Sequence, residues 1–184
     1  MPSKLISLLF LTLAFIAPTN AQTPMRDLAA QRSAMQKLSV MHGTWLGQGE
    51  RYLPSGETYR FTQTLRIAPQ SSGLLTTIAG QSLHHGNEAE KKPGSGSFAV
   101  VMFDETGGGY RFHSFGFGQR VEADASFPSP RVFRWTVAAG PALLRFTIDL
   151  TQDGVWNELG ERSGDGGKTW QPTNKLIAYR TALR

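Results

Sequence analysis

The stretch ETYRFTQTLRI, residues 57–67, decides the fold class of this chain. Apolar and polar side chains alternate along it, which is the period of a strand whose two faces meet different surroundings. The apolar side chains that share one face are Tyr59, Phe61, Leu65 and Ile67. Threonines and arginines occupy the other face. The pattern is typical of a half-buried antiparallel strand.

The same alternation recurs over residues 142–150, and clusters of Gly, Pro, Ser and Asp separate the other apolar runs. Counting the runs between turns predicts about ten strands. They are expected near residues 43–53, 57–68, 73–85, 97–104, 109–118, 120–127, 131–138, 142–151, 154–163 and 169–182. Short strands in succession, with no second helical layer, favour an all-β antiparallel up-and-down barrel, because closure removes exposed strand edges. An open sandwich is the alternative.

Residues 1–21 have the features of a secretory signal peptide. Lys4 precedes an apolar core from Leu5 to Ile16, and the small residues before Gln22 form a cleavage site after Ala21. The apolar core is too short to cross a bilayer of about 30 Å as a helix. We therefore predict a periplasmic or secreted protein with no membrane span.

Residues 22–42 are predicted to form a short helix and a lead-in to the barrel domain, residues 43–184. Apolar residues repeat at steps of three and four between Pro24 and Leu38, as on one face of a helix. The segment from Gly86 to Ser97 is charged and then rich in Pro, Gly and Ser, and we interpret it as a mobile loop.

Composition and motifs exclude several classes of function. The 184 residues carry 19 Lys and Arg against 14 acidic residues, a net charge of +5, and the basic residues are scattered rather than clustered as in a nucleic-acid-binding surface. The chain has no cysteine, which excludes thiol catalysis and cysteine-based metal or redox sites. No nucleophile elbow, phosphate-binding loop or dinucleotide fingerprint occurs. We predict no catalytic residue, no metal site and no nucleic-acid partner.

The predicted barrel begins with Gly43-Thr44-Trp45-Leu46-Gly47-Gln48-Gly49. In a strand, Gly43, Trp45, Gly47 and Gly49 share one face, where glycine lets another strand approach closely and Trp45 would close one end. The pattern G-x-W-x-G-x-G resembles the start of nitrobindins, and its first three positions resemble the start of lipocalins. The resemblance implies a barrel of the lipocalin and fatty-acid-binding-protein (calycin) group. The better match is to uncharacterised secreted bacterial members of this group. For these relatives the resemblance implies a fold and no established activity.

The resemblance carries two further implications. Barrels of this group often stack a late-strand arginine on the tryptophan, and Arg180 in the last predicted strand matches that position. Nitrobindins hold a ferric haem through a histidine in a late strand, whereas the last predicted strand here contains none. The four histidines are His42, His84, His85 and His113. Of the adjacent pair His84 and His85, at most one can point inward.

Residues 163–170 match the Asp-box pattern S-x-D-x-G-x-T-W of sialidases at every fixed position, through Ser163, Asp165, Gly167, Thr169 and Trp170. We interpret this single copy as a hairpin staple, because Asp can accept backbone N–H bonds and Gly can adopt positive φ.

Two acidic residues precede the staple, and paired carboxylates of this kind can perform acid–base catalysis on a sugar. Glu158 and Glu161 are three residues apart, so one strand would point them to opposite faces. We interpret both as solvated strand charges.

These observations predict an exported barrel that binds a small apolar or amphipathic molecule. The candidate ligand-binding residues are Phe61, Leu65, Met102, Arg111, His113, Phe115, Trp135 and Phe146. If the face that Arg111, His113 and Phe115 share lines the cavity, His113 is a polar contact for the ligand. The sequence does not decide which face lies inside for the strands near Phe98 and Tyr110, since both faces carry large apolar residues.

Two alternative functions stay open at this point. One is a nitrobindin-like protein that binds haem through His84, His85 or His113, although we predict no cofactor. The other is an envelope protein-interaction module that uses the loop from Gly86 to Ser97.

Overall fold

A computed structural model describes residues 28–85, 96–116 and 118–181 of the chain. The predicted signal peptide and most of the predicted loop, residues 86–95, lie outside the described residues. The helical elements are α1 (Leu28–Gln36) and two short 3-10 helices, η1 (Lys37–Met41) and η2 (Ser71–Gly73). The strands are β1 (Gly43–Tyr52), β2 (Thr58–Gln70), β3 (Leu75–His85), β4 (Gly96–Asp104), β5 (Gly109–Gly116), β6 (Gln119–Ser129), β7 (Val132–Ala139), β8 (Ala142–Asp149), β9 (Val155–Ser163) and β10 (Gln171–Thr181).

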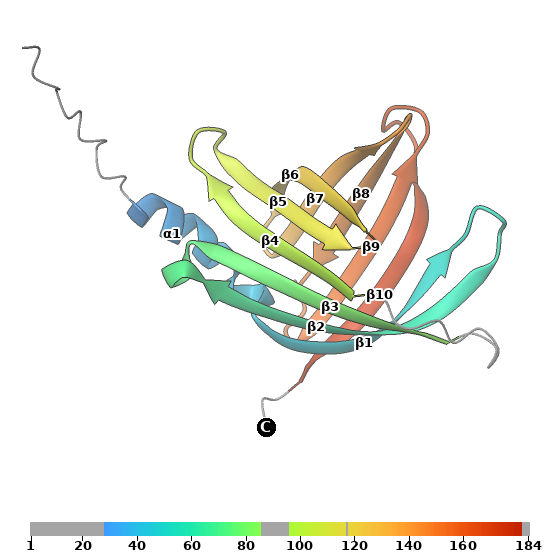
Figure 1. Cartoon of the computed structure of the whole chain (residues 1–184), viewed down its shortest axis with the longest axis horizontal. Coiled ribbons are helices and arrows are strands. Elements are labelled where there is room, and N and C mark those ends of the chain that lie inside the picture. Colours follow the sequence, from blue (N-terminus) through green and yellow to red (C-terminus); the bar gives the residue numbers. More distant parts are fainter. Residues whose placement is uncertain (1–27, 86–95, 117, 182–184) are drawn as a thin grey trace, which may run out of the picture.

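The ten strands form one closed antiparallel barrel (Figure 1). Each strand pairs with its neighbours in sequence, and β1 pairs with β10 to close the ring. The predicted fold class is therefore confirmed. The strand that opens the sequence argument behaves as expected: Phe61, Leu65 and Ile67 are buried in β2, whereas Arg66 is exposed.

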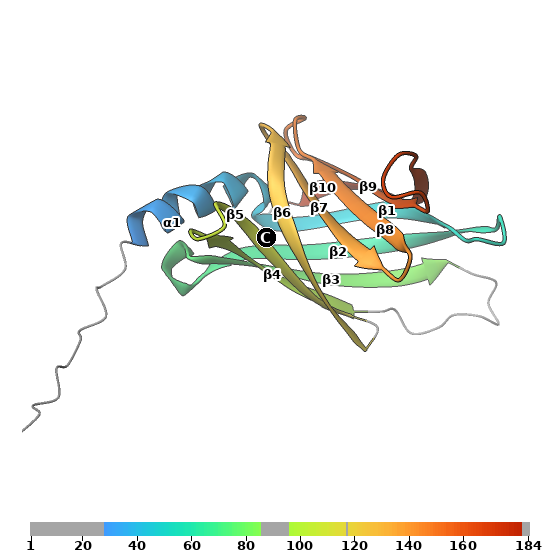
Figure 2. The same ribbon diagram turned by 90° about the horizontal axis from the view of Figure 1, so that it is seen from above.

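The helical segment lies against one end of the barrel (Figures 1 and 2). Met35, Leu38 and Met41 are almost completely buried there. The hydroxyl of Tyr110 in β5 donates a 2.7 Å hydrogen bond to the carbonyl of Ala34, which ties the helix to the wall. We call this the capped end. Among the described residues, no helix is long and apolar enough to cross a membrane.

Trp45 closes the capped end from inside. Its side chain is 1% exposed, and its indole N–H donates to the carbonyl of Met41 over 2.8 Å. The Arg180 guanidinium stacks on the indole with its central carbon 4.4 Å from the ring centroid, which is the contact that the resemblance implied. The same guanidinium donates to the carbonyls of Val40 and His42, so it joins the last strand to the lead-in.

Large rings fill the barrel next to Trp45. The indole of Trp156 packs 5.6 Å from that of Trp45, and Phe133 is fully buried. Further along, Phe112 and Trp135 stack with centroids 4.4 Å apart. The capped half is therefore packed with side chains.

Glycine permits the close approach at the closing seam. A Cβ on Gly47 would lie 2.2 Å from the carbonyl oxygen of Ile177 and 2.4 Å from the Cα of Ala178. No larger residue fits there without moving β10 away from β1.

The Asp-box residues form the predicted hairpin staple between β9 and β10. The Ser163 hydroxyl donates to Asp165 over 2.7 Å, and the N–H of Thr169 donates to the same carboxylate over 2.9 Å. The Thr169 hydroxyl also donates to this carboxylate, over 2.6 Å, and has the largest effect on its pKa. Together these hydrogen bonds hold the pKa of Asp165 far below its usual range. The indole N–H of Trp170 donates to the carbonyl of Gly167 over 3.0 Å.

Candidate functional site

A cavity of about 160 Å³ lies inside the barrel, between the packed half and the end opposite the helix. All of its lining side chains come from the inward faces of the strands. They are Arg51, Tyr59, Phe61, Gln63, Ser82, His84, Ser97, Phe146, Glu158, Asn174 and Leu176. We call this space the barrel cavity.

The strand register explains why these residues meet. Along one level of the barrel, His84 pairs with Phe61, and Phe61 pairs with Gly49. Gly49 pairs in turn with Leu176, which pairs with Glu158. Gly49 has no side chain, and the Phe61 ring occupies that space, since a Cβ there would lie 2.3 Å from the ring. His84 and Glu158 thus line one cavity from strands that are far apart on the ring.

Glu158 is the acidic residue of the barrel cavity. The indole N–H of Trp156 donates to its carboxyl over 3.2 Å, and the Asn174 amide also hydrogen-bonds it. Burial raises the pKa of Glu158, and the hydrogen bonds and the charge of Arg51 oppose that rise. Desolvation dominates because the low-dielectric interior disfavours the charged form.

A β-bulge positions the Asn174 amide beside Glu158. The register between β10 and β9 shifts between Pro172 and Asn174, which turns Asn174 into the barrel. Its side chain is 8% exposed and occupies space that a Cβ on Gly160 would fill, 2.0 Å from the amide oxygen. Gly160 and the bulge therefore set the place of the amide.

Charged and aromatic groups surround the mouth of the barrel cavity. The rings of Tyr59 and His84 meet edge to face with centroids 5.2 Å apart. The Arg51 guanidinium lies 6.0 Å from the centroid of the Tyr59 ring and is exposed at the rim. Arg51 is two residues further toward the mouth along β1 than Gly49, which is level with Glu158.

An aromatic column connects the packed core to the cavity. Phe146 stacks on Trp135 with centroids 5.2 Å apart, and Trp135 stacks on Phe112. The cavity therefore has one apolar wall, made by Phe146, Phe61 and Leu176, beside its polar groups.

The predicted ligand-binding residues divide into three groups. Phe61 and Phe146 line the cavity, whereas Leu65 and Trp135 are buried in the core away from it. The remaining four, Met102, Arg111, His113 and Phe115, lie on the outward faces of β4 and β5.

The assignment of Arg111, His113 and Phe115 to the ligand-binding site is wrong, because the face that they share points outward. Phe115 is 47% exposed, and Arg111 pairs with Asp104 on the outer surface over 3.2 Å. His113 lies 3.5 Å from Glu122 on the same surface. The inward face of β5 carries Tyr110 and Phe112, and the inward face of β4 carries Ala99 and Val101, so Met102 also points outward. Both faces of these strands are apolar enough for either to be buried, so alternation alone did not decide between them.

Glu158 was interpreted as a solvated strand charge, and this is also wrong. Glu158 and Glu161 do point to opposite faces. Glu161 lies on the outward face, but its side chain is only 14% exposed and pairs with Arg145 over 2.8 Å, so it is not a solvated charge either. A signal for the position of Glu158 was available in the sequence. Glu158 is two residues from Trp156 in β9, so the two side chains share one face, and Trp156 is buried. Asn174 was missed because the bulge changes the parity of β10.

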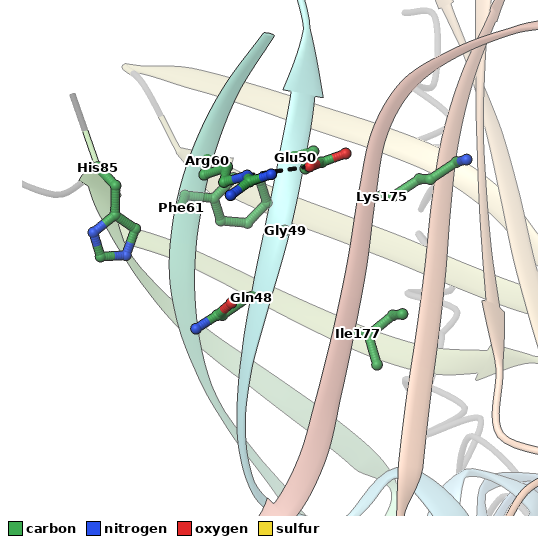
Figure 3. Close-up of a pocket in the computed structure, with 8 residues that line it drawn as sticks. All are labelled: Gln48, Gly49, Glu50, Arg60, Phe61, His85, Lys175 and Ile177. Atoms are coloured by element: carbon green, nitrogen blue, oxygen red, sulfur yellow. Dashed lines mark hydrogen bonds and ion pairs between the residues drawn. The ribbon is translucent and has the colours of Figure 1, made fainter.

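A larger depression lies on the outer surface of β10, β1, β2 and the end of β3 (Figure 3). Its volume is about 640 Å³, and most of its side chains are exposed, including Gln48, Arg60 and Lys175. Arg60 pairs with Glu50 across it over 3.3 Å. The charged groups here are solvated, so we take the barrel cavity, which lies inside the ring of strands, as the candidate site.

The barrel cavity does not fit haem. Pockets for drug-sized ligands measure about 300–1,000 Å³, and this cavity measures about 160 Å³. His84 is the histidine that lines it, while His85 points outward at the strand end and His42 lies at the capped end. Within the part of the chain that the structure describes, no three candidate ligand side chains gather as a metal site requires.

Comparison with known proteins places the fold. The chain is similar to the crystal structure of Rv2717c from M. tuberculosis, with a TM-score of 0.56, 14% identity, and coverage of 81% of this chain and 98% of that one. It is also similar to the S-type phycobiliprotein lyase CPES from Guillardia theta, with a TM-score of 0.57, 9% identity, and coverage of 83% and 93%. The chain therefore shares its barrel fold with these two structures. No family model and no curated protein matches the chain.

Proposed function

We propose that this protein binds a small amphipathic molecule in the barrel cavity. The observation that carries the proposal is the partly enclosed space beside Glu158, with an apolar wall on one side and polar groups on the other. The calycin-like fold supports it, because a closed barrel of this kind can hold one small ligand.

The size of the cavity limits what it encloses. A dry cavity of about 150 Å³ accommodates a molecule the size of benzene, and the barrel cavity measures about 160 Å³. A ring of that size fits against Phe61 and Phe146, and a larger ligand would extend through the mouth past Tyr59 and His84.

The test is native mass spectrometry of the protein purified from its own host, with an absorbance spectrum on the same sample. Ser82→Phe places a ring in the cavity, and Leu83→Phe is the matched control, because Leu83 is 64% exposed on the outer face of the same strand. We expect an added mass on the wild type and on L83F that is absent on S82F.

If the mass spectrum shows the protein without a bound ligand, the protein is titrated with benzyl alcohol. Binding is then followed through the Trp156 indole N–H resonance. Binding that S82F abolishes supports the proposal. Absence of a carried ligand overturns it if benzyl alcohol and its charged analogues benzylamine and benzoate also fail to bind, and so does binding that S82F leaves unchanged. A Soret band, which marks haem, would also overturn it, because the cavity as described does not fit haem.

The proposal includes export, which rests on the sequence of residues 1–21. The intact mass of the protein recovered from its host tests this part. We expect a chain that begins at Gln22, and a mature chain that retains the leader would refute it.

A further inference from the structure

We propose that the barrel cavity selects a cationic head group, an ammonium borne on a small apolar or aromatic body. This inference rests on the proposed function, because it specifies the ligand class of the same cavity. Glu158 and the aromatic wall are the observations from which it is argued.

The contacts of Glu158 leave a role for a cation. The two groups that hydrogen-bond its carboxyl are neutral donors, the Trp156 indole and the Asn174 amide, and the charge of Arg51 also acts on it. Neutral hydrogen bonds compensate a buried carboxylate only in part, because the interior disfavours its charge. A bound ammonium would supply a charge-assisted hydrogen bond of the stronger kind.

The surrounding rings favour the same ligand charge. Phe61, Phe146 and Tyr59 line the cavity together with the carboxyl, and aromatic faces attract cations through their quadrupole. A carboxylate among aromatic rings is the chemistry by which proteins bind ammonium ions. An anionic head group would meet Glu158 inside the cavity and would be repelled.

The cation at the mouth does not reverse this preference. Arg51 is exposed at the rim, nearer to solvent than the level of Glu158. Its charge reaches Glu158 from the rim, where water screens it in part, whereas the charge of Glu158 lies within the cavity. His84 lines the same mouth, so the binding comparison is made at one fixed pH, pH 8, for all three probes.

The experiment compares three probes of one shape, benzylamine, benzyl alcohol and benzoate, at fixed pH and ionic strength. Binding is followed by the Trp156 indole N–H resonance, because this group touches the Glu158 carboxyl. We expect benzylamine to bind roughly ten- to a hundredfold more tightly than benzyl alcohol, the range for a hydrogen bond to a charged group. Benzoate should bind more weakly than either.

Two variants assign the preference to Glu158. Glu158→Gln should reduce the ratio between benzylamine and benzyl alcohol to within about twofold, the ratio expected without a charge-assisted bond. Glu161→Gln removes a carboxylate from the outward face of the same strand and should leave the ratio unchanged.

The outcomes separate the two proposals. Equal binding of benzylamine and benzyl alcohol to the wild type, or tighter binding of benzoate, overturns the inference and leaves the proposed function standing. Failure of all three probes, together with a bare mass from the host, overturns the proposed function itself. The wild-type comparison is decisive even if E158Q does not fold.

Discussion

Gly47→Ala tests how the barrel closes. The added Cβ would lie 2.2–2.4 Å from three atoms of Ile177 and Ala178, two of which belong to the backbone. These separations are 1.0–1.2 Å shorter than the 3.4 Å at which ordinary contact begins. No flexible side chain can move away, so relief requires β1 and β10 to separate at the seam that closes the ring.

The expected cost follows from this geometry. Overpacking a well-packed interior costs about 1–3 kcal/mol, and contacts against backbone place this variant near the upper end, at about 3 kcal/mol. For a domain of this size, each kcal/mol lowers Tm by about 2–4 °C, so we expect a fall of about 6–12 °C.

The assay is thermal and guanidinium unfolding followed by tryptophan fluorescence, with Gly109→Ala as the matched control. A Cβ on Gly109 would meet only the Ala125 carbonyl oxygen, at 3.8 Å, so this variant should keep or slightly raise the stability. A Tm for G47A within about 1 °C of the wild type, a shift of well under 1 kcal/mol, would refute the argument.

Three further predictions concern single side chains. Arg180→Met should lower the free energy of unfolding by about 2 kcal/mol, because it removes the stack on Trp45 and two hydrogen bonds to the lead-in; an unchanged guanidinium midpoint would contradict it. Glu158→Gln should be more stable than the wild type at pH 8, and this difference in stability should vanish as the pH falls to 4.5, the ordinary pKa of the carboxyl. The reason is that a pKa raised in the native state destabilises the fold at every pH above the pKa of the unfolded chain. Thermal unfolding across this range checks it, and a gap independent of pH would rule it out. Asp165→Asn should be less stable than the wild type at neutral pH, and this difference in stability should narrow below pH 3.8. The reason is that a pKa lowered in the native state stabilises the fold above the pKa of the unfolded chain, and this stability is lost as the pH falls below it. Urea midpoints from pH 7 to pH 2 test the prediction, and a difference that widens in acid would oppose it.

Much of the architecture could be predicted from local patterns. Alternation in residues 57–67 identified a strand and its buried face correctly, because its two faces differ sharply in polarity. The glycines around Trp45 indicated a close crossing, and Arg180 meets Trp45 as the resemblance implied. The Asp-box forms its predicted turn, since its hydrogen bonds are nearly all local.

The candidate site was much less predictable. Phe61 and Phe146 were correctly placed in the interior, but Arg111, His113 and Phe115 were assigned to the wrong side of β5. A period of two says that faces alternate, and only polarity says which one is buried. Where both faces are apolar, the polarity signal is absent.

The sequence by itself determined that the chain alternates as strands, turns at its glycine and proline clusters, and begins its barrel at Gly43. These properties depend on residues a few positions apart, whose spacing is visible in one dimension. Only the tertiary structure decided that Glu158 lies inside, that a bulge brings Asn174 to it, and that the space between them and Phe61 stays open. Those properties depend on closure of the ring, which brings β9, β10, β1, β2 and β3 around one cavity and removes Glu158 from water.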